Sequence, residues 1–190
     1  MIEKTNFKDL KIITNLIHKD NRGYFKEILV EKKIKLKFPF IVMSCSNKNV
    51  LRGLHLQNTN PQGKYVSVVS GKIFDVCVDI RKKSKTFGKY FSIILSEKNS
   101  KTFGNYFTFI LSEKNSKSLY VPPGFAHGFC TLNEENYIIY SCTNYRHKES
   151  EISINFNDKD LNIKWPSKNP IVSKKDKLAM SFSDFKKKYR

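Results

Sequence analysis

A sixteen-residue segment occurs twice in succession, as SKTFGKYFSIILSEKN and then SKTFGNYFTFILSEKN, over residues 84–115. The aromatic and β-branched residues of each copy favour a β-strand. Because every strand added to an up-and-down path reverses the chain, two copies cannot both be regular neighbouring strands while the flanking segments keep their places. We expect one copy to fill a strand position and the other to form a surface excursion, because a long surface insertion adds little closure entropy.

The rest of the chain also predicts strands. Residues 10–33 predict two strands around a turn at Asp20–Gly23, and residues 64–81 predict a hairpin that turns at Ser70–Gly71. The continuous apolar run FPFIVMSCS (38–46) predicts a buried strand. About ten strands at turn spacings of roughly eight to twelve residues predict a jelly roll or barrel, in a single domain over residues 1–190.

The C-terminal region differs from the rest, because its pattern is helical. Ser173 has Asp176 three positions on, which is the pattern of a helix N-cap followed by an acidic residue in the first turn. We therefore expect one or two short helices after residue 173.

The chain has a formal net charge of +18. A polyanion partner and a lysine-rich solvated surface both explain this charge, and the second explanation is favoured because the lysines are spread along the chain.

No apolar segment is long enough to cross a bilayer, and the N-terminus lacks a signal-peptide core, so we expect a cytoplasmic protein that binds neither membranes nor nucleic acid. The four cysteines (Cys45, Cys77, Cys130 and Cys142) are expected to be reduced.

Several ionisable residues lie in otherwise apolar segments: Arg52, His55, Lys64, His127 and Tyr140. Each alone is more often a structural residue than a catalytic one. Together they are the residue types that carbanion chemistry beside a carbonyl requires. The four histidines have no metal-ligand spacing, so we expect neither a metal nor a cofactor.

Four motifs occur in order along the chain: R-G-L-H-x-Q, Q-G-K, F-D-V-x-V-D-I-R and P-x-G-F-A-H-G-F. With them the chain resembles the dTDP-4-dehydrorhamnose 3,5-epimerase family of nucleotide-sugar epimerases over nearly its whole length. The resemblance implies an all-β cupin double-stranded β-helix (jelly roll) with short C-terminal helices, in a homodimer that exchanges strands. It also implies an isomerase that inverts C3, C5 or both in a nucleotide-diphosphate 4-keto-6-deoxy sugar, for bacterial surface polysaccharides such as a capsule.

The resemblance also assigns roles to residues. His55 is the implied base, Asp176 pairs with it, Lys64 stabilises the enolate oxygen, and Tyr140 returns a proton from the opposite face. The implied substrate-binding residues are Arg52, His127, Gln57, Arg22 and Glu27, the last two contacting the nucleotide and belonging to the partner subunit. None of these residues lies in either copy of the repeat, so we assign the repeat no chemistry.

One departure from the family pattern concerns the nucleotide. The family's Q-x-N-x-S pattern, associated with reading thymine, is replaced here by Val42-Met43-Ser44-Cys45-Ser46. A GDP-linked sugar such as a 4-keto-6-deoxy-heptose is therefore an alternative substrate. Two further alternatives are an epimerase specific for C3 and a non-catalytic sugar- or polyanion-binding cupin. A sugar 3,4-ketoisomerase is disfavoured because Gln57 stands where another histidine is expected.

Overall fold

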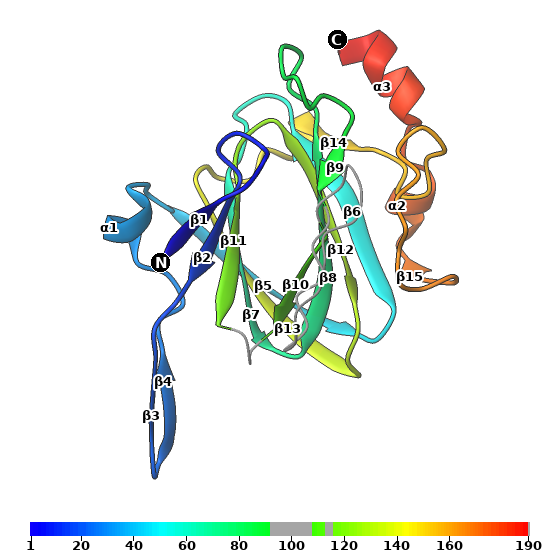
Figure 1. Ribbon diagram of the computed structural model, residues 1–190. Coiled ribbons are helices and arrows are strands. Elements are labelled where there is room, and N and C mark those ends of the chain that lie inside the picture. The colour runs from blue at the N-terminus through cyan, green and yellow to red at the C-terminus, as the bar shows by residue number, and fades with distance from the viewer. Residues whose placement is uncertain (92–107, 113–115, 190) are drawn as a thin grey trace.

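The computed structural model describes residues 1–91, 108–112 and 116–189. Two sheets face each other and enclose a core (Figure 1). The first sheet has the order β1 (Ile2–Lys4), β2 (Lys11–Thr14), β11 (Lys117–Val121), β7 (Lys64–Ser70), β13 (Glu135–Cys142) and β5 (Phe40–Asn47). The second has the order β10 (Thr108–Ser112), β8 (Lys72–Asp79), β12 (Phe125–Thr131), β6 (Val50–Gln57) and β14 (Glu151–Ser153), with β9 (Tyr90–Phe91) beside β8 and β15 (Ile171–Val172) beside β6.

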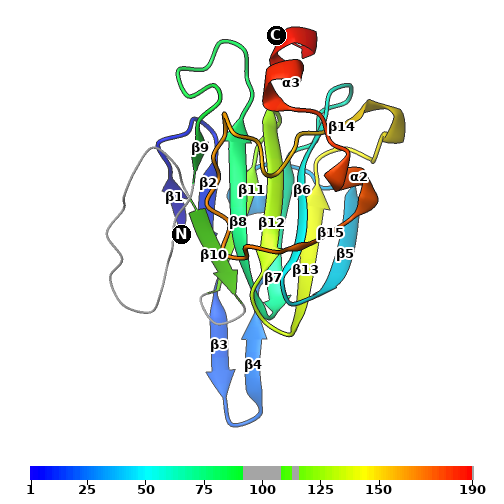
Figure 2. The same cartoon turned by 90° about the vertical axis from the view of Figure 1, so that its right-hand side faces the viewer.

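The remaining elements lie around these sheets. Strands β3 (Ile17–Asp20) and β4 (Gly23–Lys26) form a hairpin that extends away from both sheets (Figure 2). The helices are α1 (Glu31–Ile34), α2 (Lys174–Lys177), α3 (Phe182–Tyr189) and the short 3₁₀ helix η1 (Lys148–Ser150). The mostly β architecture, the Asp20–Gly23 turn and the C-terminal helices confirm those predictions. Over the described ranges, no helix has the length and apolar character needed to cross a membrane.

The second sheet is buried on both faces. On β8, Ile73 and Cys77 pack into the core between the sheets, whereas Phe74 and Val76 pack on the outer side. The outer side is covered by the C-terminal segment, including Phe182 of α3. This double burial explains why every residue of β8 after Lys72 is buried and why apolar residues occur on both of its faces.

The predicted hairpin at Ser70–Gly71 is wrong. The chain turns there, but β7 pairs with β11 and β13, and β8 pairs with β9, β10 and β12. The turn therefore carries the chain from one sheet to the other. Two alternating strands joined by a short turn have the same local sequence pattern whether they pair with each other or with distant strands.

The burial predicted for residues 38–46 is also wrong. These residues contribute most of β5, which forms the edge of the first sheet and pairs only with β13 among the described strands. Ile41 and Met43 are 61% and 60% exposed. The apolar side chains on this outer face therefore have no covering layer within the described part of the chain.

The two copies of the repeat share one strand position. Tyr90 and Phe91 of the first copy lie opposite Val78 and Cys77 of β8, and Thr108 of the second copy lies opposite the next residue, Val76. The expectation that a single copy fills the position is therefore wrong, because the position is composite. The expected surface excursion falls outside the described residues.

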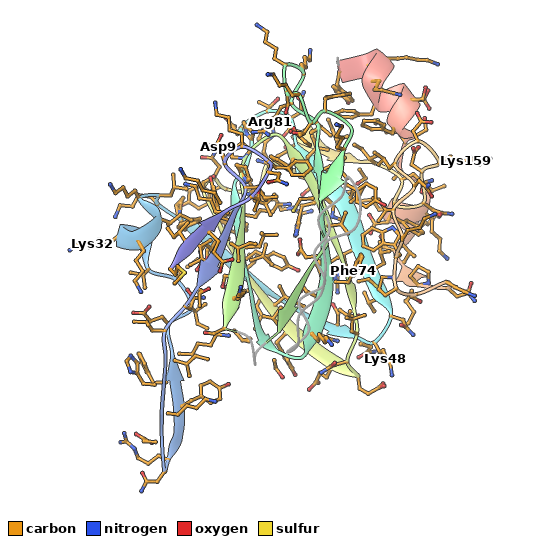
Figure 3. All side chains as sticks on the ribbon, viewed as in Figure 1. Asp9, Lys32, Lys48, Phe74, Arg81 and Lys159 are labelled. Atoms are coloured by element: carbon orange, nitrogen blue, oxygen red, sulfur yellow. The ribbon has the colours of Figure 1, made fainter. Side chains whose placement is uncertain are left out.

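Lysine side chains reach outward from different sides of the molecule. Lys32, Lys48 and Lys159 are all exposed and lie far apart, on α1, in the β5–β6 turn and near the C-terminal segment (Figure 3). These three side chains therefore do not form one patch.

Candidate active site

A cavity of about 770 Å³ lies between the two sheets, next to α2. Its volume is typical of small-molecule sites. Seven residues predicted for the site line it: Arg52, His55, Gln57, Lys64, His127, Tyr140 and Asp176. Strands β6 and β12 supply one wall, strands β5, β7 and β13 supply the facing wall, and α2 closes one side. The structure thus brings together residues up to 124 positions apart in the sequence.

His55 and Asp176 form a close pair. His55 Nε2 lies 2.5 Å from Asp176 Oδ1, and the Asp176 side chain is buried. Asp176 reaches this position because Ser173 caps α2, its hydroxyl accepting a hydrogen bond from the Asp176 backbone N–H at 3.1 Å. Burial raises the pKa of Asp176, but the hydrogen bond and charge of His55, together with hydrogen bonds from Ser173 and the Gly53 backbone, outweigh burial and leave that pKa below its ordinary value. A carboxylate in this position fixes the histidine ring and stabilises its protonated form.

Two histidines share one row across the second sheet. His127 of β12 lies directly opposite His55 of β6 on one side and Cys77 of β8 on the other. The two strands can approach closely here because Gly53 and Gly128 have no side chains. A Cβ at Gly53 would lie only 2.5 Å from the Gly128 Cα. Residues directly opposite on neighbouring strands project on the same side, so both histidines face the cavity.

His127 is held by a buried carboxylate. Its Nε2 lies 2.8 and 3.0 Å from the two Asp75 oxygens, and the Cys77 thiol donates to Asp75 at 3.6 Å. Burial, with the Asp75 charge, raises the pKa of the Cys77 thiol well above its ordinary value, so the thiol keeps the proton that it donates to Asp75. The three side chains form a hydrogen-bonded network that orients His127.

Lys64 is the cation on the facing wall. It projects from β7, directly opposite Cys142 of β13. Burial lowers the pKa of its ammonium group below the ordinary value, although neighbouring thiols and carboxylates act in the opposite direction. A fixed, poorly hydrated cation of this kind stabilises an oxyanion more strongly than a solvated lysine would.

Tyr140 lies on the same wall as Lys64, two residues before Cys142 on β13. Its hydroxyl lies 3.1 Å from the Ser44 hydroxyl of β5. Burial raises the pKa of Tyr140 far above its ordinary value, while the Ser44 hydrogen bond acts in the opposite direction. Tyr140 therefore remains a neutral phenol that carries a proton at the cavity wall.

Arg52 connects the two walls. Its Nε donates to the Ser46 hydroxyl at 3.1 Å, and its guanidinium also donates to the Cys45 carbonyl at 3.3 Å. Both acceptors belong to β5, whereas Arg52 belongs to β6. Because both acceptors are neutral, they hold the guanidinium at the cavity without cancelling its positive charge. Such a cation suits an anionic ligand.

Gln57 lines the cavity, but its amide is occupied by the protein. The amide nitrogen donates to the carbonyls of Asn60 and Tyr145 at 2.6 and 3.3 Å, and the amide oxygen accepts from the His147 backbone N–H at 2.9 Å. In this arrangement Gln57 holds two loops beside the cavity. Substrate contact by Gln57 stays a prediction.

Arg22 and Glu27 are not brought to this cavity within the chain. Arg22 lies at the tip of the β3–β4 hairpin, where its guanidinium pairs with Asp20 at 2.6 Å and its side chain is 86% exposed. Glu27 follows the hairpin and pairs with Lys33 at 2.5 Å. The structure therefore separates these two from the seven residues that line the cavity.

Among the cavity residues that were not assigned roles from the sequence are Ser44, Arg146, Glu151 and Lys175. Glu151 pairs with Arg146 at 2.5 Å and with Lys175 at 2.7 Å, and the Arg146 hydrogen bond is the main cause that lowers the pKa of Glu151 to about 2. Arg146 and Glu151 lie five residues apart, and Lys175 lies in α2. The three match no local pattern, so nothing in the sequence pointed to them. Asp75, which holds His127, lies within the F-D-V motif, and that motif was the available signal.

Comparison with known proteins gives consistent matches. The sequence profile of the dTDP-4-dehydrorhamnose 3,5-epimerase family matches residues 4–101 and 97–184, as two segments that overlap inside the repeat. Enzymes named dTDP-4-dehydrorhamnose 3,5-epimerase from Shigella flexneri and Salmonella typhimurium are 39% and 40% identical to the chain. The first match covers 95% of each chain, and the second covers 94% of this chain and 93% of the relative.

A solved structure agrees with these sequence matches. The dTDP-6-deoxy-D-glucose-3,5-epimerase of Legionella pneumophila, in complex with dTDP-4-keto-L-rhamnose, superposes with a TM-score of 0.84 at 39% identity. That match covers 95% of this chain and 92% of the other. The chain belongs to the dTDP-4-dehydrorhamnose 3,5-epimerase family of cupin-type nucleotide-sugar epimerases.

Proposed function

We propose that the chain is an isomerase that inverts C3 and C5 of a dTDP-4-keto-6-deoxy sugar. The observation that carries this proposal is the placement of His55 and Tyr140 on opposite walls of one cavity. Inversion of a carbon centre requires a base on one face of the sugar and an acid on the other. A histidine paired with a carboxylate and a neutral phenol meet that requirement.

The first step is removal of a proton next to the C4 carbonyl. His55 takes the proton from C3 or C5, the C–H electron pair moves toward the carbonyl, and an enolate oxygen forms at C4. Asp176 stabilises the resulting imidazolium. The Lys64 ammonium stabilises the enolate oxygen, because its charge is already in place before the negative charge develops.

The second step is reprotonation from the opposite face. The Tyr140 O–H bond breaks, a new C–H bond forms at the same carbon, and a phenolate remains. The centre is inverted because the proton left toward one wall and returned from the other. Exchange with solvent then restores the His55 and Tyr140 protonation states, so each inversion in D₂O introduces one deuterium.

The nucleotide proposed is dTDP, because the relatives above are named for dTDP sugars. Val42 and Ser44 line the cavity where the family pattern has amides. This replacement keeps a GDP-linked 4-keto-6-deoxy-heptose as the competing substrate. Turnover of the two nucleotide sugars is measured in parallel. Equal or faster turnover of the dTDP sugar supports the proposal, and faster turnover of the GDP sugar contradicts it.

The protein is proposed to act as a homodimer in which the β3–β4 hairpin reaches the partner. Tyr24 and Phe25 of the hairpin are 61% and 69% exposed, and Ile41 and Met43 on the β5 edge are exposed to a similar extent. Such apolar surfaces suit contact with a second copy. Arg22 at the tip of the hairpin would then contact the nucleotide in the partner's cavity.

The activity is tested by product analysis. Wild-type protein is incubated with dTDP-4-keto-6-deoxyglucose in D₂O, and NMR measures inversion and deuterium at C3 and C5. Deuterium at both carbons supports a 3,5-epimerase, and deuterium at C3 alone supports the C3-specific alternative. His55→Asn should lower turnover by about 10²–10⁴-fold. Unchanged turnover in His55→Asn would contradict the mechanism and favour the non-catalytic binding protein.

The contribution of the hairpin is tested by mixing two inactive variants. Arg22→Ala and His55→Asn homodimers each lack one group in both sites. In a mixed dimer, the Arg22→Ala subunit provides His55 and its partner provides the arginine, so one of the two sites is complete. Recovered turnover after subunit exchange supports the partner contact. No recovery, with mixed dimers verified by native mass spectrometry, contradicts it.

A further inference from the structure

The hydroxyls of Ser44 and Tyr140 lie 3.1 Å apart across two neighbouring strands. Ser44 of β5 is directly opposite Ile138 of β13, and Tyr140 is directly opposite Val42. The two side chains are therefore diagonal neighbours on the face that lines the cavity, and both are cavity residues. Among the described residues, Ser44 is the hydrogen-bond partner of the Tyr140 hydroxyl.

The direction of this hydrogen bond decides whether Tyr140 can act as an acid. A phenol carries one proton, which it gives either to Ser44 or toward the cavity. If Tyr140 donates to Ser44, its proton points away from the substrate. If Ser44 donates to Tyr140, the phenol proton is free to point at the sugar, and the phenol oxygen already accepts a hydrogen bond that strengthens as negative charge develops on it.

We propose that Ser44 is the positioning residue for Tyr140, donating its hydroxyl proton to the phenol oxygen so that the phenol proton faces the sugar. During reprotonation the Tyr140 O–H bond breaks, the C–H bond forms, and the Ser44 O–H group stabilises the phenolate that remains. This role rests on the proposed function, because it applies only if Tyr140 returns a proton to carbon. It makes Ser44 specific to the second step and leaves the first step to His55.

Burial makes this assistance necessary. The low-polarity surroundings of Tyr140 oppose the phenolate, which is the cause of the raised pKa of Tyr140, and the Ser44 hydrogen bond acts against that effect. Hydrogen bonds to charged groups are worth about 1.5–3 kcal/mol, which corresponds to about 10–100-fold in rate. Loss of Ser44 is therefore expected to slow reprotonation by about that factor.

The two steps can be separated in D₂O. His55 is partly exposed, with 34% of its side chain accessible, so a proton that it removes can exchange with solvent. An enolate that waits longer for Tyr140 is returned more often by His55 from the original face. That return gives sugar carrying deuterium without inversion. The diagnostic quantity is the ratio of exchange without inversion to inversion at each carbon.

Ser44→Ala should lower the rate of inversion by about 10–100-fold, raise the ratio of exchange to inversion at one or both carbons, and leave KM nearly unchanged. Ser44→Thr keeps the hydroxyl and should restore the wild-type ratio. Cys45→Ala is the matched control, because Cys45 is the next residue on β5 and its side chain is exposed on the other face. This control should retain the wild-type ratio.

Two results would overturn the role of Ser44. One is a wild-type ratio in Ser44→Ala, and the other is an equal loss of exchange and inversion. If Ser44→Ala does not fold, Ser44→Cys replaces it, because a thiol is a weak donor of similar size and should give an intermediate ratio. Failure of the proposed function itself is distinguishable, because then wild-type protein shows neither exchange nor inversion with either nucleotide sugar.

Discussion

Phe91 and Thr108 occupy successive positions beside β8, opposite Cys77 and Val76, although residues 92–107 separate them in the sequence. The separation equals the length of the repeat, so Thr108 takes the register position that Ser92 would take. The first copy is anchored at its start, where the hydroxyls of Ser84 and Thr86 donate to Asp79. The second copy is followed in the sequence by β11, which is fixed in the first sheet. Each copy therefore supplies the part of the strand nearest to the segment that holds it, Ser84–Thr86 for the first copy and β11 for the second.

Deletion of residues 92–107 should therefore preserve the fold and the activity. The deletion joins two residues that already pair with successive residues of β8, and it removes sixteen residues from the connection between them, so the free energy of unfolding should stay equal or rise by about 1 kcal/mol. Deletion of residues 100–115 should behave alike, because the first copy then supplies nearly the same strand. Urea unfolding and turnover measure both effects, and an unfolded product from either deletion would contradict the composite strand.

Asp176→Asn should lower kcat by about 10²-fold, because the imidazolium of His55 loses its charged partner. The pKa of Asp176 is lowered in the folded protein. Its contribution to stability is thus present above the ordinary pKa of about 3.9 and is lost as the pH falls through the lower folded value. The difference in unfolding free energy between wild type and variant should be constant above about pH 5 and shrink in acid. Asp184→Asn, at an exposed carboxylate of α3, should show a much smaller difference.

Lys64 should set an alkaline limit on activity. Burial lowers its pKa, so the ammonium loses its proton below the ordinary value of about 10.4, and turnover should fall as the pH rises through that lowered value. Lys64→Arg keeps its positive charge at every accessible pH. Its turnover should therefore be lower than that of wild type but should not fall at alkaline pH. Lys64→Met should lower kcat by about 10²–10³-fold, by analogy with the loss of other oxyanion-stabilising groups, without lowering stability. A pH–rate profile of Lys64→Arg identical to that of wild type would exclude this assignment.

The His127–Asp75 pair should show strong energetic coupling. His127→Leu leaves the carboxylate of Asp75, which is 1% exposed, without its main partner, and should destabilise the fold by about 3 kcal/mol. The double variant Asp75→Leu, His127→Leu should recover part of that loss, because no unpaired charge remains. Urea unfolding of the two single variants and the double variant measures the coupling. Additive losses would show that the pair is energetically independent.

The sequence by itself determined the local features of this protein. The Asp20–Gly23 turn and the Ser173 cap were predicted because their hydrogen bonds lie within a few residues. Through the family resemblance that they carry, the motifs around His55 and His127 predicted an all-β epimerase fold and residues that line its cavity. Each of these signals is carried by neighbouring residues in the chain.

Only the tertiary structure decided how those segments are partnered. The chain crosses between sheets at Gly71 where a hairpin was expected, and β5 is an exposed edge, because strand pairing depends on distant segments with similar patterns. The Ser44–Tyr140 contact joins residues 96 positions apart. The repeat offers two nearly identical segments to one strand position, so its sequence cannot specify the register, and the anchors at its two ends decide which residues pair with β8.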